Sequence, residues 1–308
     1  MTRLVHSSGG FVRSLQMSSA RIFAFVEGRL DRTFFDRIFH RELQATSIKH
    51  QVIAMKEIPD QAGGKTALLA VFRDFRRRGV LRTTAFGKSM VSVFLVDKDS
   101  DDYCRKQLRS PHLIYSKTYD LEAHLYSCAD LHRALADASG TTLEQAKALL
   151  PDPQTWLANA VYQWRDWISL CLISQDNSLN CGCTFERVSQ VNPDPLHPPD
   201  VAKIDEFKKI LSQKMGVSEK DFEVLYESTR RSVDRSLRLG EPLRYFKGKW
   251  LSHLIQKFLE TTVRPADANF NNIGDKLEST LVAQVAYASR CACCTSYSEK
   301  LTPLVALL

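Results

Sequence analysis

Short, continuously apolar runs alternate with amphipathic segments over the first third of the chain. Strands that are covered on both faces appear in a sequence as such runs, and residues 22–26 form one. Further strands are predicted at residues 52–58, 91–96 and 113–118, of which 91–96 is the most apolar. Between the first two of these strands, apolar residues recur at helical spacing over residues 34–43. This alternation predicts an α/β fold: an open, parallel, four-stranded sheet with right-handed crossovers and helices on both faces.

After residue 119 the apolar positions follow helical spacing in most segments. The pattern predicts helices at residues 121–135, 142–150, 154–172, 201–215, 218–237, 242–262 and 276–289. Residues 177–200 contain several prolines and interrupt this series as a loop or a small hairpin. We therefore expect a flexible arm at residues 1–20, an α/β domain at 21–135 and a mainly helical C-terminal domain at 136–308.

Composition places the chain among ordinary globular proteins. Hydrophobic residues make up 44% and charged residues 25% of the 308 positions. We find no apolar run that approaches the roughly 18 residues a membrane-spanning helix needs, and no continuous apolar core of a secretory signal. Eight cysteines without such a signal favour reduced thiols. We expect a cytoplasmic protein that is not bound to a membrane.

The formal net charge of +7 favours polyanionic partners where the cations cluster. Residues 73–88 carry six basic residues and one acid, and residues 229–249 carry seven basic residues and two acids. In the second segment, cations are interleaved with Tyr245 and Trp250, which suits phosphate contact and base stacking. A solvated face and an ordinary core stripe explain the same pattern. The candidate substrate-binding residues here are Arg231, Arg235, Lys247 and Lys249.

Carboxylates lie at the ends of all four predicted strands, those of the second strand at Glu57 and Asp60. The carboxyl ends of parallel strands lie at one edge of a sheet, where ligands bind; the acids expected there are Glu27, Asp97, Asp99, Asp101 and Glu122. Residues two apart on a strand share a face, so we expect Asp97 and Asp99 to point together. Crowded carboxylates repel unless a divalent cation lies between them, and oxygen ligands suit Mg²⁺ or Mn²⁺. The pattern predicts metal-dependent chemistry on phosphodiesters, with Glu27, Asp97, Asp99 and Asp101 as ligands.

Other charged residues near these strand ends have two interpretations each. Glu122 is a candidate catalytic residue that completes the metal site, or an acid in the first turn of a helix. Lys65 and Lys117 are candidates for contact with a phosphate or a leaving group, or are simply exposed lysines. For Asp31 we favour a role as a helix cap over a role as a ligand.

Two further motifs suggest nucleotide binding and zinc binding, but their spacing does not match known sites of either kind. Residues 63–66, Gly-Gly-Lys-Thr, match half of a phosphate-binding P-loop, but the required earlier glycine is absent, so we reject nucleotide binding there. The cysteine pairs are spaced more closely than paired ligands of structural zinc usually are. Whether they bind zinc stays open for Cys181, Cys183, Cys291, Cys293 and Cys294.

The acidic strand ends resemble a known family. Residues 26–31, Val-Glu-Gly-x-x-Asp, followed by Asp97-x-Asp99-x-Asp101, are similar to the Toprim domain of topoisomerases, primases and overcoming-lysogenization-defect nucleases. In that family the glutamate and the Asp-x-Asp pair carry the metal, which the resemblance places on Glu27, Asp97 and Asp99. The chain is too short to carry the second apparatus of a topoisomerase or a primase convincingly, so a nuclease fits best.

Two later segments narrow the resemblance. Residues 119–122, Tyr-Asp-Leu-Glu before a helix, and residues 243–251 resemble the AriB-type Toprim subunits of PARIS anti-phage systems. This implies a toxic effector that is held by an ABC-type, AriA-like ATPase partner. Once released, the effector cuts host RNA, with transfer RNA as the substrate class. A homodimer would suit the cutting of a folded RNA. The alternatives are a DNA-directed Toprim nuclease and a non-catalytic adaptor or regulatory subunit that docks an ATPase.

Overall fold

The chain forms two compact units that are not contiguous in sequence. The computed structural model describes residues 8–58, 60–184, 190–192, 194, 196–262, 273–287 and 292–308. The first unit comprises Met1–Asp97, Leu108–Ser116 and Val282–Leu308, and the second comprises Lys98–Gln107 and Lys117–Leu281. These boundaries differ from the predicted domains at residues 21–135 and 136–308.

The first unit is built on a twisted sheet of mainly parallel strands. β1 (Ile22–Val26), β2 (His50–Ala54), β4 (Lys88–Val96) and β5 (Leu113–Tyr115) are parallel in the order β2-β1-β4-β5, which confirms the predicted α/β fold. The strand predicted at 52–58 is shorter, because the chain turns into the 3₁₀ helix η1 (Met55–Glu57). A fifth strand, β3 (Arg82–Ala85), was not predicted and pairs antiparallel with the first half of β4.

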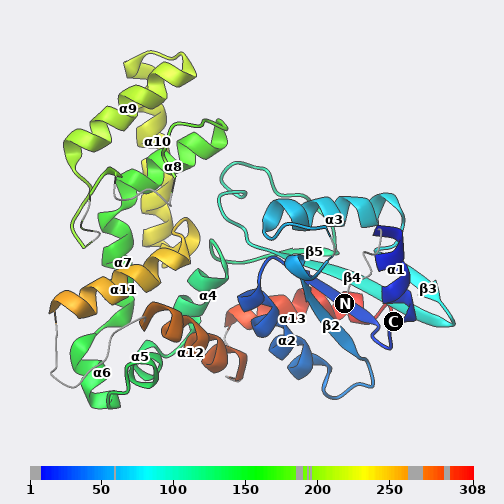
Figure 1. Ribbon diagram of the computed structural model, residues 1–308. Helices are drawn as coiled ribbons and strands as arrows, with labels where there is room; N and C mark the ends of the chain where they lie inside the picture. The colour runs from blue at the N-terminus through cyan, green and yellow to red at the C-terminus, as the bar shows by residue number, and fades with distance from the viewer. Residues whose placement is uncertain are drawn as a thin grey trace. The chain divides into compact units, whose positions relative to one another are not determined.

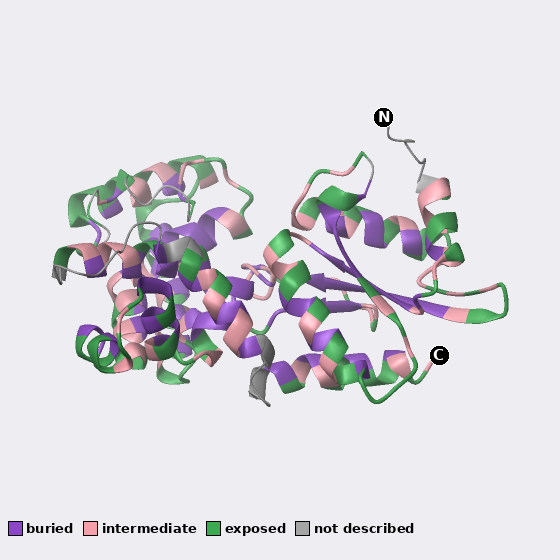
Figure 2. Ribbon diagram, turned by 60° about the horizontal axis from the view of Figure 1, so that its bottom comes forward, coloured by how far each residue is buried: buried purple, intermediate pink, exposed green. Residues whose placement is uncertain are grey.

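Helices cover both faces of this sheet (Figure 1). α1 (Ser8–Met17) and α3 (Lys65–Arg77) lie on one face, where Phe25 stacks on Phe94 with ring centroids 4.7 Å apart. α2 (Arg29–Leu43) and α13 (Ala292–Val305) lie on the other face. The strands are almost wholly buried between these layers, whereas the β3–β4 hairpin is exposed (Figure 2).

Two expectations about the ends of the chain are corrected by this arrangement. Residues 8–17, expected to be part of a flexible arm, form α1, and Leu15 of this helix is buried in the core. The C-terminal residues, assigned to a helical domain, return to the α/β unit as α13. Tyr297 of α13 packs edge-on against Phe34 and Phe35 of α2, at centroid distances of 6.3 and 5.1 Å.

The second unit is helical, as predicted for most of its length. Among the described residues its helices are α4 (Leu121–Cys128), α5 (Leu131–Ser139), α6 (Leu143–Leu149), α7 (Pro153–Gln163), α8 (Arg165–Asp176), α9 (Val201–Met215), α10 (Glu219–Arg238), η3 (Pro242–Arg244), α11 (Gly248–Thr262) and the first part of α12 (Ile273–Tyr287). Trp164 and Trp167 lie in its core. In the described ranges, we find no helix with both the length and the apolar character that a membrane span requires.

Candidate active site

Two acidic strand ends of the first unit meet at the carboxyl edge of the sheet. β1 and β4 are parallel neighbours, with Phe25 opposite Phe94, so Glu27 and Asp97 both follow the ends of adjacent strands. The backbone N–H of Asp97 donates a hydrogen bond to Oε1 of Glu27 at 3.0 Å. Both residues are half-buried. The end of β4 therefore holds the Glu27 carboxylate in place.

The turn before α3 reaches the same edge. The N–H of Gly64 approaches the carbonyl oxygen of Glu27 at 3.4 Å, and Gly64 has a φ of 89°, which favours glycine. Lys65 begins α3 directly after this turn. Its ammonium lies 6.0 Å from the centroid of the Tyr115 ring on β5. The first unit therefore brings Lys65 to the sheet edge that carries Glu27.

Asp31 acts as a helix cap. Its Oδ2 accepts a hydrogen bond from the N–H of Gly28 at 2.9 Å, where α2 begins. The carboxylate thereby satisfies one of the backbone donors that a helix N-terminus leaves without an intrahelical partner. The expectation that Asp31 caps the helix is confirmed.

The acidic loop after β4 does not continue the strand. β4 ends at Val96, and Asp99 has a φ of 49°, so the argument from strand geometry that Asp97 and Asp99 share a face does not apply. In the second unit, the N–H of Asp99 donates to the carbonyl of Tyr119 at 2.6 Å. The N–H of Asp101 donates to the carbonyl of Lys98 at 3.0 Å. Backbone hydrogen bonds within a turn of the second unit therefore fix the positions of Asp99 and Asp101.

Lys98 is buried in that turn and anchors it. Its Nζ donates to the carbonyl of Lys117 at 2.9 Å and lies 3.5 Å from Oδ2 of Asp102. Burial lowers the pKa of Lys98, and the nearby Asp102 carboxylate opposes this effect. Asp102 also accepts a hydrogen bond from Nε of Arg244 at 3.0 Å. The side chain of Lys117 itself is exposed.

Asp120 is a buried carboxylate that was not among the predicted site residues. It caps α4 by accepting the N–H of Ala123 at 2.8 Å, and both of its oxygens accept the N–H of Gly248 at 3.0 Å. Burial raises the pKa of Asp120 well above its usual range and the Glu122 carboxylate adds to this, while the two N–H donors oppose it. An aspartate directly before an apolar helix is the signal that identifies such a cap.

Glu122 lies two residues after Asp120, in the first turn of α4. It is buried, and its Oε1 lies 3.7 Å from Nζ of Lys249, whose side chain is 64% exposed. Lys249, predicted to contact substrate, is therefore also the ion-pair partner of Glu122. The second unit thus joins the two segments, 119–122 and 243–251, that carry the narrower resemblance.

The basic segment near α10 separates into surface and core. Arg231 and Arg235 are exposed on α10, and Lys247 is half-buried. Tyr245 is buried, and the Trp250 ring packs against that of Trp164 with centroids 5.1 Å apart. Tyr245 therefore belongs to the core, whereas Trp250 is half-buried.

The cysteines do not form a metal site in the described ranges. No group of three or more His, Cys, Asp or Glu side chains there could hold a metal ion. The free thiols are those of Cys104, Cys171, Cys181, Cys183 and Cys294. These five agree with the expected reduced thiols, whereas Cys128 is disulfide-bonded and departs from that expectation. Cys291 and the side chain of Cys293 lie outside the described residues, so the zinc question for them stays open.

The described geometry offers chemistry at one sheet edge of the first unit. Glu27, Asp97 and Lys65 provide two carboxylates and a cation there, and a donor set of oxygens alone suits Mg²⁺ or Mn²⁺. Sequence comparisons do not assign this arrangement to a known group. No protein-family model matches the chain, and no curated protein matches it.

Proposed function

We propose that the protein is a metal-dependent endonuclease that hydrolyses phosphodiester bonds, with RNA as its substrate. The observation that supports this most directly is the hydrogen bond from the Asp97 N–H to the Glu27 carboxylate at the carboxyl edge of the sheet. Ligands of open parallel sheets bind at this edge. Two strand ends that place carboxylates there are difficult to explain by packing alone.

The residues present fit a weakly held Mg²⁺ or Mn²⁺. Mg²⁺ usually binds through one or two carboxylates, waters and substrate phosphates, instead of a cage made only of protein ligands. Two residues with carboxylates at one sheet edge, Glu27 and Asp97, match that habit. When bound, the ion would neutralise charge on the phosphodiester and acidify an attacking water.

The chain's own groups have distinct roles in this proposal. The Asp97 N–H fixes the orientation of the Glu27 carboxylate. The side chains of Glu27 and Asp97 would hold the ion. Lys65 would contact the phosphate or offset charge on the leaving group. Three further carboxylates and one lysine enter the proposal from the sequence pattern, with the carboxylates as ligands or catalytic groups and the lysine as a phosphate contact: Asp99, Asp101, Glu122 and Lys117.

The biological setting rests on the family resemblance. By that resemblance, the substrate is transfer RNA, and the protein is a cytoplasmic effector of anti-phage defence. An ABC-type ATPase would hold it until infection, and the released protein could act as a homodimer.

The decisive experiment compares Glu27→Gln with the native protein in a cleavage assay with Mg²⁺ or Mn²⁺. Glutamine keeps an oxygen that can accept the Asp97 N–H but removes the negative charge that binds the ion. We expect the cleavage rate to fall by about 100-fold or more. Glu57→Gln is the matched control, because Glu57 is a partly exposed acid of the same unit that pairs with Arg32.

Native rates for Glu57→Gln and a large loss for Glu27→Gln would support the proposal. Equal cleavage by Glu27→Gln and the native protein would remove it. Because an ATPase partner could restrain the nuclease, the assay uses both the isolated chain and the chain purified with any co-expressed ATPase. Transfer RNA and DNA of similar length are assayed side by side.

A non-catalytic adaptor is the second candidate, and one observation favours it. In the described ranges, no three-ligand group is present, although nucleases of this kind need a metal ion. Calorimetry with Mg²⁺ and Mn²⁺ separates the two candidates. Binding near millimolar concentration that Glu27→Gln abolishes supports the nuclease, whereas no binding together with a stable ATPase complex supports the adaptor.

A further inference from the structure

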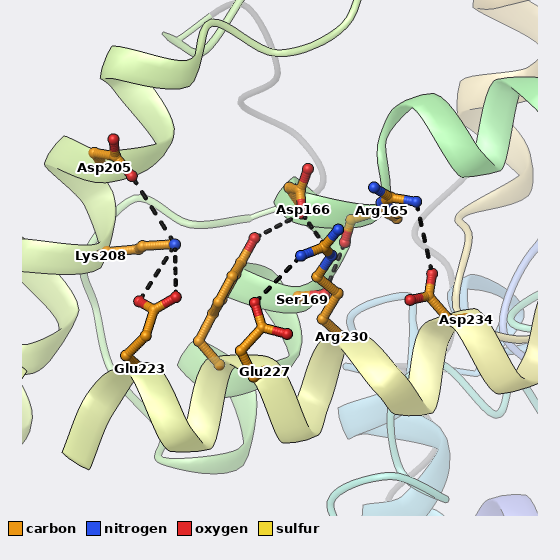
Figure 3. A network of polar contacts seen from close by, with 10 residues as sticks. Arg165, Asp166, Ser169, Asp205, Lys208, Glu223, Glu227, Arg230 and Asp234 are labelled. Atoms are coloured by element: carbon orange, nitrogen blue, oxygen red, sulfur yellow. Dashed lines mark hydrogen bonds and ion pairs between the residues drawn. The ribbon is translucent and has the colours of Figure 1, made fainter. Parts of the chain in front are cut away.

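One side of α10 forms ion pairs with α8 and α9, in which the charges compensate each other (Figure 3). Arg230 lies with its Nε 3.3 Å from Oδ1 of Asp166, and its Nη1 donates to Glu227 at 3.2 Å. Lys208 of α9 reaches Glu223 at 3.2 Å. These ion pairs bind α10 to α8 and α9. Arg230, which begins the basic run, is therefore a structural cation.

Another side of α10 carries cations without such partners. Arg231, Arg235 and Arg238 are all exposed. In the part of the chain that the structure describes, none of the three makes an ion pair. The nearby carboxylates have other partners: Asp234 lies 4.0 Å from Nη1 of Arg165, and Glu241 accepts from Arg244 at 3.2 Å. The three guanidinium groups thus keep their full charge toward solvent.

Helical spacing places these three arginines together. Positions i, i+4 and i+7 fall within about 60° of one another around a helix, and they span about 10 Å along its axis. We call Arg231, Arg235 and Arg238 the arginine face. Leu239, which directly follows α10, is 61% exposed, so the residues that the structure describes leave this end of the helix open.

The charges of α10 are also divided along its length. Its first half contains Glu219, Asp221, Glu223 and Glu227, whereas its second half contains four of its five basic residues. A polyanion would be repelled by the first half and attracted by the second. This division favours an extended anion that lies across the C-terminal half of the helix.

We propose that the arginine face binds the phosphate backbone of the nucleic acid, and that it positions the substrate without taking part in the cleavage step. Guanidinium groups bind phosphates in bidentate geometry and cannot lose their charge. Three of them in a row suit a repeating chain of phosphates better than a single anion. That the bound strand is the cleavage substrate rests on the proposed function; the phosphate contact itself does not.

The test measures binding separately from cleavage. Fluorescence anisotropy with a labelled single-stranded RNA, in EDTA, gives the affinity as a function of salt concentration. Arg231→Gln/Arg235→Gln/Arg238→Gln should reduce the slope of log K against log salt by about 2, since each phosphate contact with a single strand contributes about 0.7. We expect the affinity at 0.1 M salt to fall by about tenfold or more.

A control with the same change in net charge isolates the location of the cations. Arg41→Gln/Arg77→Gln/Lys203→Gln removes three cations that already pair with carboxylates, at 3.0, 2.6 and 2.8 Å. This control should keep the native slope and affinity. Circular dichroism checks that both triple variants are folded. The same measurement with DNA of identical sequence shows whether the contact distinguishes the two backbones.

The outcomes separate this proposal from the proposed function. An unchanged slope in the arginine-face variant, or an equal loss in the control, overturns the arginine face even if the protein cleaves RNA. A reduced slope of log K against log salt that occurs only in the arginine-face variant supports the proposed phosphate contact, even if no cleavage is found. Cleavage kinetics then test positioning: the variant should raise KM far more than it lowers kcat.

Discussion

The contact between Asp120 and Gly248 shows how a single residue can determine which segments meet. Asp120 accepts N–H groups from its own helix and from the start of α11. A side chain on Gly248 has no room, because a Cβ atom there would lie 2.0 Å from the backbone nitrogen of Ala123. The glycine is needed for close approach of two backbones, not for a turn.

Gly248→Ala should therefore destabilise the helical unit. The methyl group forces α11 away from α4, which strains the packing and weakens the hydrogen bond to a buried carboxylate. We expect the free energy of unfolding to fall by about 3 kcal/mol. Urea unfolding of the native and variant proteins, followed by circular dichroism, measures this change.

The matched control for this prediction is Gly140→Ala. Gly140 has a φ of 70°, and a Cβ atom there would meet nothing within 4 Å, so its replacement tests the backbone cost alone. That cost should be about 1 kcal/mol. If the two variants lose the same stability, the close approach of the two backbones is not the reason that position 248 requires glycine.

The β3–β4 hairpin is the element whose sequence suits its geometry least. The chain reverses through two residues, Phe86 and Gly87, which have φ values of 52° and 73°. Positive φ at both positions is the geometry of a type I′ turn, which favours Asn-Gly and is unfavourable for a bulky side chain. Phe86 is 75% exposed, so little packing compensates for that strain.

Phe86→Asn should stabilise the protein. Asparagine tolerates the left-handed backbone, and the exposed aromatic ring contributes little to the core. We expect the free energy of unfolding to rise by about 1 kcal/mol, measured by urea unfolding. Phe86→Leu keeps a bulky apolar side chain and should leave stability close to the native value. A loss of stability in Phe86→Asn would mean that the ring packs against the protein in solution.

Elements were predictable from the sequence where one pattern acts alone. The fully apolar strand at residues 22–26 and the helix at 201–215 have the predicted bounds. β3 was not predicted, because its residues alternate between exposed and half-buried and no apolar run marks the strand. The turn after β4 that contains Asp99 was not predicted, because Asp99 has a positive φ that hydrophobic periodicity does not indicate.

Proximity at the candidate site was predictable only within the first unit. Parallel strands must end at a common edge, so the position of Glu27 beside the end of β4 follows from topology. The contact between Asp120 and Gly248 depends on packing between segments more than a hundred residues apart, so no local sequence pattern predicts it. The division of α10 into a paired side and the arginine face depends on which carboxylates of α8 and α9 lie nearby.

At the scale of the whole molecule, the first unit is completed by the end of the chain. α13 supplies Tyr297, which is buried against Phe34 and Phe35 of α2. The backbone carbonyls of Leu307 and Leu308 accept hydrogen bonds from Arg82 and Arg21. The α/β unit therefore joins segments from both ends of the sequence, and a helical C-terminal domain beginning at residue 136 does not describe it.

Tyr297→Ala should consequently destabilise the α/β unit and leave the helical unit largely intact. Truncation of a large buried aromatic side chain costs about 3–5 kcal/mol, and here the cavity would open beside α2. Hydrogen exchange followed by mass spectrometry should show faster exchange in α2 and β1, with α8 and α10 unchanged. Tyr162→Ala is the control, because Tyr162 is 55% exposed and its loss should alter neither unit. Equal acceleration in α2 and α10 would instead mean that the two units unfold together, and no change in α2 would mean that α13 does not pack there.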